Sequence, residues 1–439
     1  MNGNFEPKKF GADKIAFLGM FALSLLIAQL IVSRNSALNF SEPIELAHSG
    51  LSISVPTGKG WQSELQWQYH SNGFTLSSHF IVGPGISGAR VRCRYFPTSL
   101  ATTAEVLFEQ QAAEIKGTIK ETGQSQKDNL TIYWARIEGP VLAFVGTVEL
   151  PNNRTVNIEV IQTTFEINLD EKVFEKVIES LHYEQDNLVK NGAEIVKEIQ
   201  SRGIDSFISD RNQQTCFFIQ DSENNNIGFS IDVLGESGID EQFDIKAANH
   251  LYMTGPNTQE QVSIFIGDNN LEKYIWQSET NVGFSRKGTE ITRDETGAIN
   301  VIRQTDTSSK ENSYLSGSTV IPSVFLELLV RYIIENDANE IVIDVIEADG
   351  YITPRYLSFR SAREDTQTYS YVVILEFLDG RGVSELIYLD TDKQITKILI
   401  QQERIYNLER TDIESIAGEF PERASDILKR KELLENEVF

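Results

Sequence analysis

The chain has 439 residues and a formal net charge of −25 at pH 7, and 40% of its residues are hydrophobic. This length and composition suit two or three packed domains and exclude a disordered stalk. A body so acidic repels phosphodiester backbones, so nucleic acid is excluded as an expected partner.

The first predicted element is a membrane-spanning helix over residues 15–33. This stretch has no charged side chain, and a helix of its length just crosses a hydrocarbon core of roughly 30 Å. Three lysines precede it and one arginine follows closely, which places residues 1–14 in the cytoplasm and residues 34–439 outside. The prediction is a single-pass cell-membrane protein with a periplasm-like body, and the membrane is one expected partner. A cleaved signal peptide is the alternative.

A spacer over residues 34–47 leads into the first predicted domain, residues 48–184. Its order of three strands, a helix, three strands and a second helix is typical of an α+β sandwich with one antiparallel sheet. The first helix is expected to begin at Thr102 or Thr103, because Glu105 follows just inside it.

Two short motifs of this domain carry a family resemblance. They are Ile53-Ser-Val-Pro56 followed by Gly60-Trp61, and Phe174…Ile178-Glu-Ser-Leu181 running into His182-Tyr183. In these motifs the domain resembles the PsbP-like family of small sandwich domains. The resemblance implies an accessory or binding role, and therefore one or more protein partners. No functional residue is carried over from it.

Residues 185–204 are predicted to form an amphipathic linking helix, and a second domain follows over residues 205–410. Its long strands are joined by short turns, such as Asp390-Thr-Asp392, which is typical of a curled antiparallel sheet or half-barrel. The charged segment 411–439 is expected to be a solvated helical tail.

One helix interrupts the second domain. It is expected to begin at Ser318 or Thr319 and is apolar nearly all round, so it must be buried in the concavity of the sheet. With this helix the domain resembles the lipoprotein-carrier (LolA/LolB-like) half-barrels, which implies a cavity for an apolar ligand. Phe325, Leu329 and Ile333 are the candidate ligand contacts. The alternative is that these side chains simply fill the cavity.

Arg90, Arg92 and Arg94 form a candidate stripe for an anion or a protein partner. Alternation along one strand places all three on the same face of an otherwise acidic chain. The alternative is that they pair with carboxylates of neighbouring strands.

Other motifs give no catalytic, cofactor or metal site. The segment 83–88 matches G-x-G-x-x-G, but a strand follows it where a dinucleotide site requires a helix, so we expect a hairpin loop. The five histidines lack metal-ligand spacing. Cys93 and Cys216 are expected to be buried thiols in different domains.

The predicted fold is therefore α+β, with a single N-terminal transmembrane helix, an antiparallel-sheet sandwich domain, and a curled antiparallel sheet with a buried helix. The predicted function is that of a membrane-anchored extracytoplasmic interaction or assembly protein without catalytic activity. The alternative function is carriage or sensing of a lipid or another apolar ligand in the second domain.

Overall fold

The fold is mostly β. The structure is a computed structural model that describes residues 38–58, 60–70, 73–83, 86–99, 102–163, 171–207, 212–240, 243–255, 258–315, 319–336, 340–361, 369–378, 382–402 and 404–428. Strands make up 56% of the residues that the structure describes, so the predicted α+β class is wrong. The sequence patterns underestimated the strands because some are mostly polar, such as Thr118–Lys127 and Ser309–Leu315.

The predicted membrane anchor is not supported. Its residues, 15–33, lie outside the described residues. Within the described ranges, no helix combines the length and the apolar character that crossing a bilayer requires. We therefore withdraw the single-span helix, the membrane as a partner, and the single-pass cell-membrane localisation.

The first domain is built on an eight-stranded antiparallel sheet with the order β5-β7-β8-β12-β11-β10-β9 and with β6 paired to β7. The strands are β5 (Trp61–Ser63), β6 (Gln68–His70), β7 (Gly73–Gly83), β8 (Ile86–Phe96), β9 (Thr118–Lys127), β10 (Leu130–Glu138), β11 (Leu142–Leu150) and β12 (Arg154–Gln162). Two smaller sheets are formed by β1 (Asn39–Phe40) with β4 (Pro56–Thr57), and by β2 (Ile44–Leu46), β3 (Leu51–Ile53) and β13 (His182–Tyr183).

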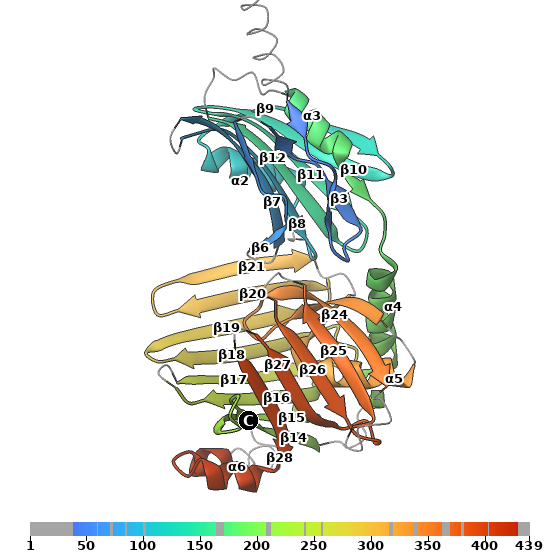
Figure 1. The fold of residues 1–439 in the computed structure, drawn as a ribbon, viewed down its shortest axis with the longest axis vertical. Coiled ribbons are helices and arrows are strands. Elements are labelled where there is room, and N and C mark those ends of the chain that lie inside the picture. Colours follow the sequence, from blue (N-terminus) through green and yellow to red (C-terminus); the bar gives the residue numbers. More distant parts are fainter. Residues whose placement is uncertain are drawn as a thin grey trace, which may run out of the picture.

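Helices cover both faces of this sheet (Figure 1). Helix α2 (Ala104–Glu114) packs on one face through Phe108 and Ala112, and α3 (Glu171–Ser180) packs on the other through Val173 and Val177. Thr103 caps α2 by accepting a hydrogen bond from the backbone N–H of the third helical residue, which confirms the predicted helix start.

Helix α4 (Asn187–Arg202) links the two domains. Its N-cap is Asp186, and Gly203 ends it. Gly192 lies directly on the second domain, because a Cβ atom there would be 2.0 Å from the carbonyl oxygen of Val342. The helix is thus docked along its length on strand β23 (Glu340–Ile346).

The second domain is one 15-stranded sheet that is antiparallel except at its β22 edge. Its order is β21-β20-β19-β18-β17-β16-β15-β14-β28-β27-β26-β25-β24-β23-β22. The first group of strands is β14 (Asn212–Gln220), β15 (Asn226–Asp240), β16 (Phe243–Met253), β17 (Gln259–Gly267), β18 (Tyr274–Val282), β19 (Ser285–Arg293), β20 (Ala298–Thr305) and β21 (Ser309–Leu315). The second group is β22 (Val320–Pro322), β23, β24 (Ile352–Ser361), β25 (Tyr371–Phe377), β26 (Ser384–Leu389), β27 (Ile395–Gln401) and β28 (Ile405–Thr411).

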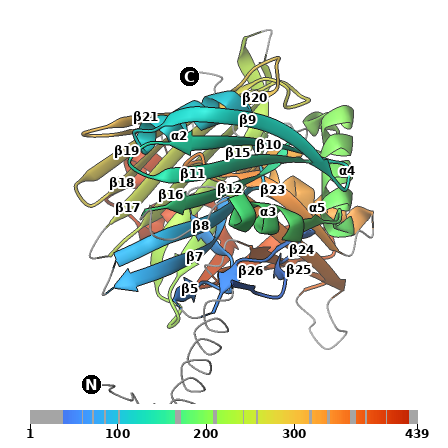
Figure 2. The ribbon, with the colours of Figure 1, turned by 90° about the horizontal axis from the view of Figure 1, so that it is seen from above.

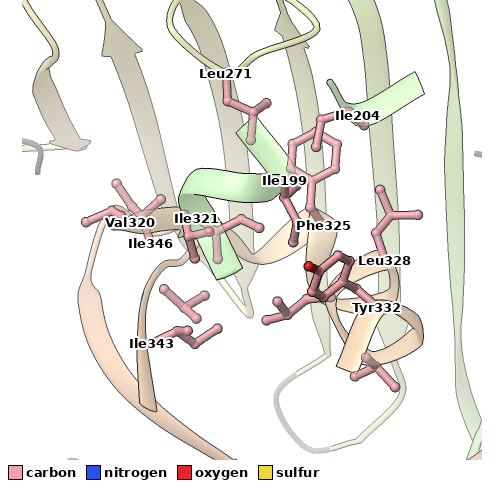
Figure 3. Close-up of a cluster of buried hydrophobic side chains, with 14 of the residues drawn as sticks. Ile199, Ile204, Leu271, Val320, Ile321, Phe325, Leu328, Tyr332, Ile343 and Ile346 are labelled. Carbon is pink, nitrogen blue, oxygen red and sulfur yellow. The ribbon is translucent and has the colours of Figure 1, made fainter. Parts of the chain in front are cut away.

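The sheet curls so that these two groups of strands face each other as crossing layers (Figure 1). Side chains from both layers, from α4 and from α5 (Leu326–Glu335) form one continuous hydrophobic core between them (Figure 3). The helix begins later than predicted: Val320–Pro322 pairs in parallel with β23, and a 3-10 turn, η2 (Ser323–Phe325), precedes α5.

The tail differs from the prediction as well. Thr411 ends β28, and α6 (Ile413–Glu419) follows with Asp412 as its N-cap. Ile416 and Phe420 are buried against Phe229 and neighbouring side chains of the sheet. This part of the tail is therefore docked on the domain and not solvated, because its apolar positions recur at helical spacing.

The first domain lies across one end of the second (Figure 2). A buried ion pair joins them, in which Arg154 Nη2 on β12 lies 3.2 Å from Asp344 Oδ2 on β23. The same guanidinium donates from Nη1 to the hydroxyl of Tyr95 at 2.5 Å. Arg154 and Asp344 are only 4% and 1% exposed, so the interface contains a fully desolvated charge pair.

Candidate functional site

A large cavity lies between the layers of the second domain. Its volume is about 910 Å³, which is at the upper end of the range for small-molecule sites. Strands β15–β20 form one wall, and the turn between β23 and β24 forms another. Tyr69 and His70, at the tip of β6, add side chains from the first domain, so both domains contribute to the site.

Polar side chains lie in direct cross-strand register across β14–β20, and most of those on β15–β20 build this wall. We call these side chains the polar row: Thr215, Asp232, Asn249, Ser263, Ser278, Thr289 and Arg303. Two residues away along each of the six strands β15–β20 is an apolar row: Leu234, Ala247, Phe265, Trp276, Ile291 and Val301.

The two rows have different surroundings although they share a face. Residues i and i+2 of a strand point to the same side of a sheet, so both rows face the concavity. The apolar row packs in the core with α4 and α5. Most of the polar row is left facing the cavity, together with a further polar set: Gln261, Thr280, Lys287 and Thr305. Half of the concave face is thus filled and the other half is open.

Hydrogen bonds from β18 and β20 hold the turn between β23 and β24 across the open half of the concave face. Ser278 Oγ donates to the carbonyl oxygen of Ala348 at 2.5 Å. Arg303 donates from Nε to the carbonyl of Asp349 at 2.8 Å and from Nη2 to the carbonyl of Gly350 at 2.6 Å. Gly350 has a φ of +78°, and a Cβ atom there would be 2.3 Å from Val301. Glycine is therefore required where the turn meets the sheet.

Asp232 is the carboxylate of the polar row. Asn249 Nδ2 donates to its Oδ1 at 2.6 Å, and Ser230 Oγ donates to its Oδ2 at 3.1 Å. Burial raises the pKa of Asp232 to about 6, although both hydrogen bonds act in the opposite direction. This carboxyl group therefore changes protonation state in mildly acidic solution.

We expect Asp232→Asn to stabilise the protein above pH 6 by about 1–3 kcal/mol relative to its effect below pH 4. Between these values the unfolded chain ionises Asp232 while the folded chain keeps the proton, so wild-type stability falls as the pH rises. Urea unfolding of both proteins from pH 3.5 to 8 measures the difference. A difference in stability that is constant across this range would contradict the prediction.

Arg355 on β24 is a fully buried cation on the opposite wall, with 1% of its surface exposed. Its Nη2 donates to Glu347, and its guanidinium lies over the ring of Phe377. Glu385 is the second carboxyl group near this cation. Burial raises the pKa of Glu385 to about 7, Arg355 opposes the shift, and Glu347 adds to it.

The predicted arginine stripe lies away from this cavity, on β8. Arg92 makes three hydrogen bonds to the carboxylate of Glu159 on β12, the shortest of them 2.7 Å. Arg90 Nη2 lies 3.7 Å from the same carboxylate, and Arg94 lies over the ring of Phe96. The first two side chains thus pair with a neighbouring strand, as the alternative expectation stated. Binding of an anion or partner by the stripe stays a prediction.

The apolar candidates Phe325, Leu329 and Ile333 are fully buried in the core between the layers. Figure 3 shows Phe325 beside Leu328 and Tyr332, within the cluster. None of the three apolar candidates is among the residues that line the cavity. They fill space, as the alternative expectation stated, and contact with a ligand is untested.

The remaining sequence candidates do not gather at the cavity. Cys93 and Cys216 are buried free thiols in different domains. The segment that matches G-x-G-x-x-G lies between β7 and β8, which pair with each other as antiparallel neighbours. Among the described residues, no three His, Cys, Asp or Glu side chains are placed to hold a metal ion.

Comparison with known proteins gives a weak structural neighbour. The sequence matches no protein-family model and no curated protein. Part of the fold is similar to the crystal structure of a beta-barrel-like protein of domain of unknown function DUF1849 from Brucella abortus. The TM-score is 0.34 at 10% sequence identity, and the match covers 46% of this chain and 96% of the other. This likeness is too weak to assign a function. The PsbP-like resemblance is not supported.

Proposed function

We propose that the protein binds a polar small molecule in the cavity of its second domain, without catalysing a reaction. The polar row carries this proposal, because it leaves hydrogen-bonding side chains facing an open volume of about 910 Å³. Groups of this kind fix the orientation of a ligand and provide specificity. The ligand chemistry differs from the apolar ligand that α5 suggested, since the apolar side chains of α5 are used in the core.

The interaction or assembly role inferred from the sequence stays a prediction. It is compatible with ligand binding, because the cavity includes Tyr69 and His70 of the first domain. The hydroxyl of Tyr69 donates to the carbonyl oxygen of Ile352 at 3.2 Å. A ligand in the cavity would therefore contact both domains and stabilise their relative arrangement.

The test is native mass spectrometry of the full chain purified from cells that make it. Thr280→Trp places a bulky ring in the cavity from β18. Thr292→Trp is the matched control, because Thr292 on β19 alternates with Ile291 of the apolar row and so lies on the opposite face. We expect wild type and Thr292→Trp to carry an additional small-molecule mass, and Thr280→Trp to carry none.

Two results would contradict the proposal. In one, all three proteins carry no additional mass. In the other, Thr280→Trp retains the same mass as wild type, which would place the molecule elsewhere. Circular dichroism of the two variants checks that both are folded.

A further inference from the structure

Strand β9 is a free edge of the first-domain sheet. Among the described strands it pairs with β10 alone, and Figure 1 shows it on the side of the first domain that lies away from the second. Its ten residues include no proline and no buried side chain. An edge of this kind presents a row of backbone N–H and C=O groups that can pair with a strand of another chain.

The turn between β9 and β10 determines which backbone groups face that edge. Asp128 and Asn129 form the turn with φ values of 48° and 66°, which is the type I′ geometry of a two-residue hairpin. The flanking residues of such a hairpin, Lys127 and Leu130, exchange both backbone hydrogen bonds. Because the pattern alternates along the strand, the open edge receives the backbone groups of Thr122, Gln124 and Gln126.

Two charged side chains of β9 have no oppositely charged partner among the described residues. Glu121 lies opposite Arg136 on β10, but Arg136 pairs with Glu138 at 2.6 Å. Lys127 Nζ donates to backbone carbonyl oxygens at the C-terminal end of α3, at 2.8 and 3.2 Å. Glu121 and Lys127 point to the same face of the sheet, because an even number of residues separates them.

We propose that β9 pairs with β9 of a second copy of this chain, antiparallel and about a two-fold axis at Gln124. In this register Gln124 lies opposite itself and Thr122 lies opposite Gln126, so the free backbone groups of all three residues form hydrogen bonds. The same register sets Glu121 opposite Lys127 of the second copy. By symmetry this pair of opposite charges forms twice.

The charges favour this register over its neighbours. Moving the axis by two residues in either direction keeps the backbone groups in phase. It sets Glu121 opposite Gly123, or Lys127 opposite Ser125, and neither shift brings opposite charges together. Charged side chains on an edge normally hinder pairing with other strands. Here they are complementary to a second copy, so this interaction surface is separate from the cavity of the second domain.

Analytical ultracentrifugation of the full chain over a concentration series tests the proposal. We expect wild type to form a dimer that dissociates on dilution. Glu121→Lys sets like charges opposite each other twice, and should raise the dissociation constant about tenfold. The matched control is Glu109→Lys, which makes the same change of charge at an exposed position of α2 and should dimerise as wild type does. Circular dichroism checks that both variants are folded.

A cysteine substitution tests the position of the axis. Gln124→Cys brings two thiols opposite each other with Cα atoms about 5.5 Å apart, which suits a disulfide bond. Cys93 and Cys216 are buried, so they do not compete. After treatment with diamide, we expect this variant to run as a covalent dimer in a non-reducing gel. The control Glu109→Cys should remain a single chain.

Three results would overturn the proposal. Wild type might prove monomeric at every concentration, or Glu121→Lys might dimerise as tightly as wild type, which would place the contact elsewhere. Gln124→Cys might also fail to cross-link although wild type dimerises. Recovery of the chain in a complex with a different polypeptide, and not with a second copy, would assign the edge to another protein. Binding of a small molecule in the cavity is independent of all these results.

Discussion

Asp344→Leu is expected to lower the free energy of unfolding by about 3–5 kcal/mol. The substitution leaves the guanidinium of Arg154 buried at the domain interface with the hydroxyl of Tyr95 as its remaining polar contact. Burial raises the pKa of Asp344, and only Arg154 opposes the shift. The carboxylate and the guanidinium thus depend on each other to remain charged in the interior.

A double-mutant cycle tests this dependence. Arg154→Met alone should also be strongly destabilising, because it leaves Asp344 without its counter-ion. The double variant Arg154→Met, Asp344→Leu should lose much less than the sum of the two, since both charges are then replaced by apolar groups. The control is Glu198→Gln, which breaks an exposed pair with Arg202 on α4 and should change stability by less than about 1 kcal/mol.

Urea unfolding followed by tryptophan fluorescence measures wild type and all four variants. Additive losses in the double variant would show that the two side chains act independently. The prediction would then be wrong, and the ion pair would have no special part in joining the domains.

Phe325→Ala is the second substitution with a large expected effect, a loss of about 3–5 kcal/mol. Phe325 is fully buried, and its ring meets that of Phe265 edge to face with centroids 5.0 Å apart. Removing the ring leaves an empty space between η2 and the apolar row. The sheet is too rigid to move in and close this space. Thermal unfolding monitored by circular dichroism provides the measurement.

The neighbouring substitution Val324→Ala is the matched control. Val324 lies one residue earlier in the same turn, but it lines the cavity and is only partly buried. It should cost about 1 kcal/mol or less. If Phe325→Ala were equally mild, the side chain would not be a core residue, and a role in contacting an apolar ligand would become the better explanation.

The sequence patterns correctly predicted features that depend only on residues close together in the sequence. Cys93 is buried as predicted, on the face of β8 that also carries Val91 and Tyr95, and capping residues correctly located the start of α2. Asp344 also carried a signal that was not used: it is the only charged residue within the apolar run Ile341–Ile346. A carboxylate in such a run indicates a buried partner.

The candidate site was not predictable in the same way. The polar row exists only because seven strands pair in one particular register, and no local pattern specifies which residue of one strand faces which residue of the next. Ser263 or Thr289 alone is an ordinary strand residue. The signal would have appeared only after the strands were aligned, as a change from apolar to polar along the same face.

The pairing of β14 with β28 has a consequence for synthesis on the ribosome. These strands lie side by side in the middle of the sheet, with Cys216 opposite Thr411, yet they are the first and last strands of the domain in chain order. During translation, β14 therefore has an open edge until every other strand has emerged. Nascent chains that stall before Ile405 would expose that edge to other copies, so this domain has a particular need for chaperone protection while it is being made.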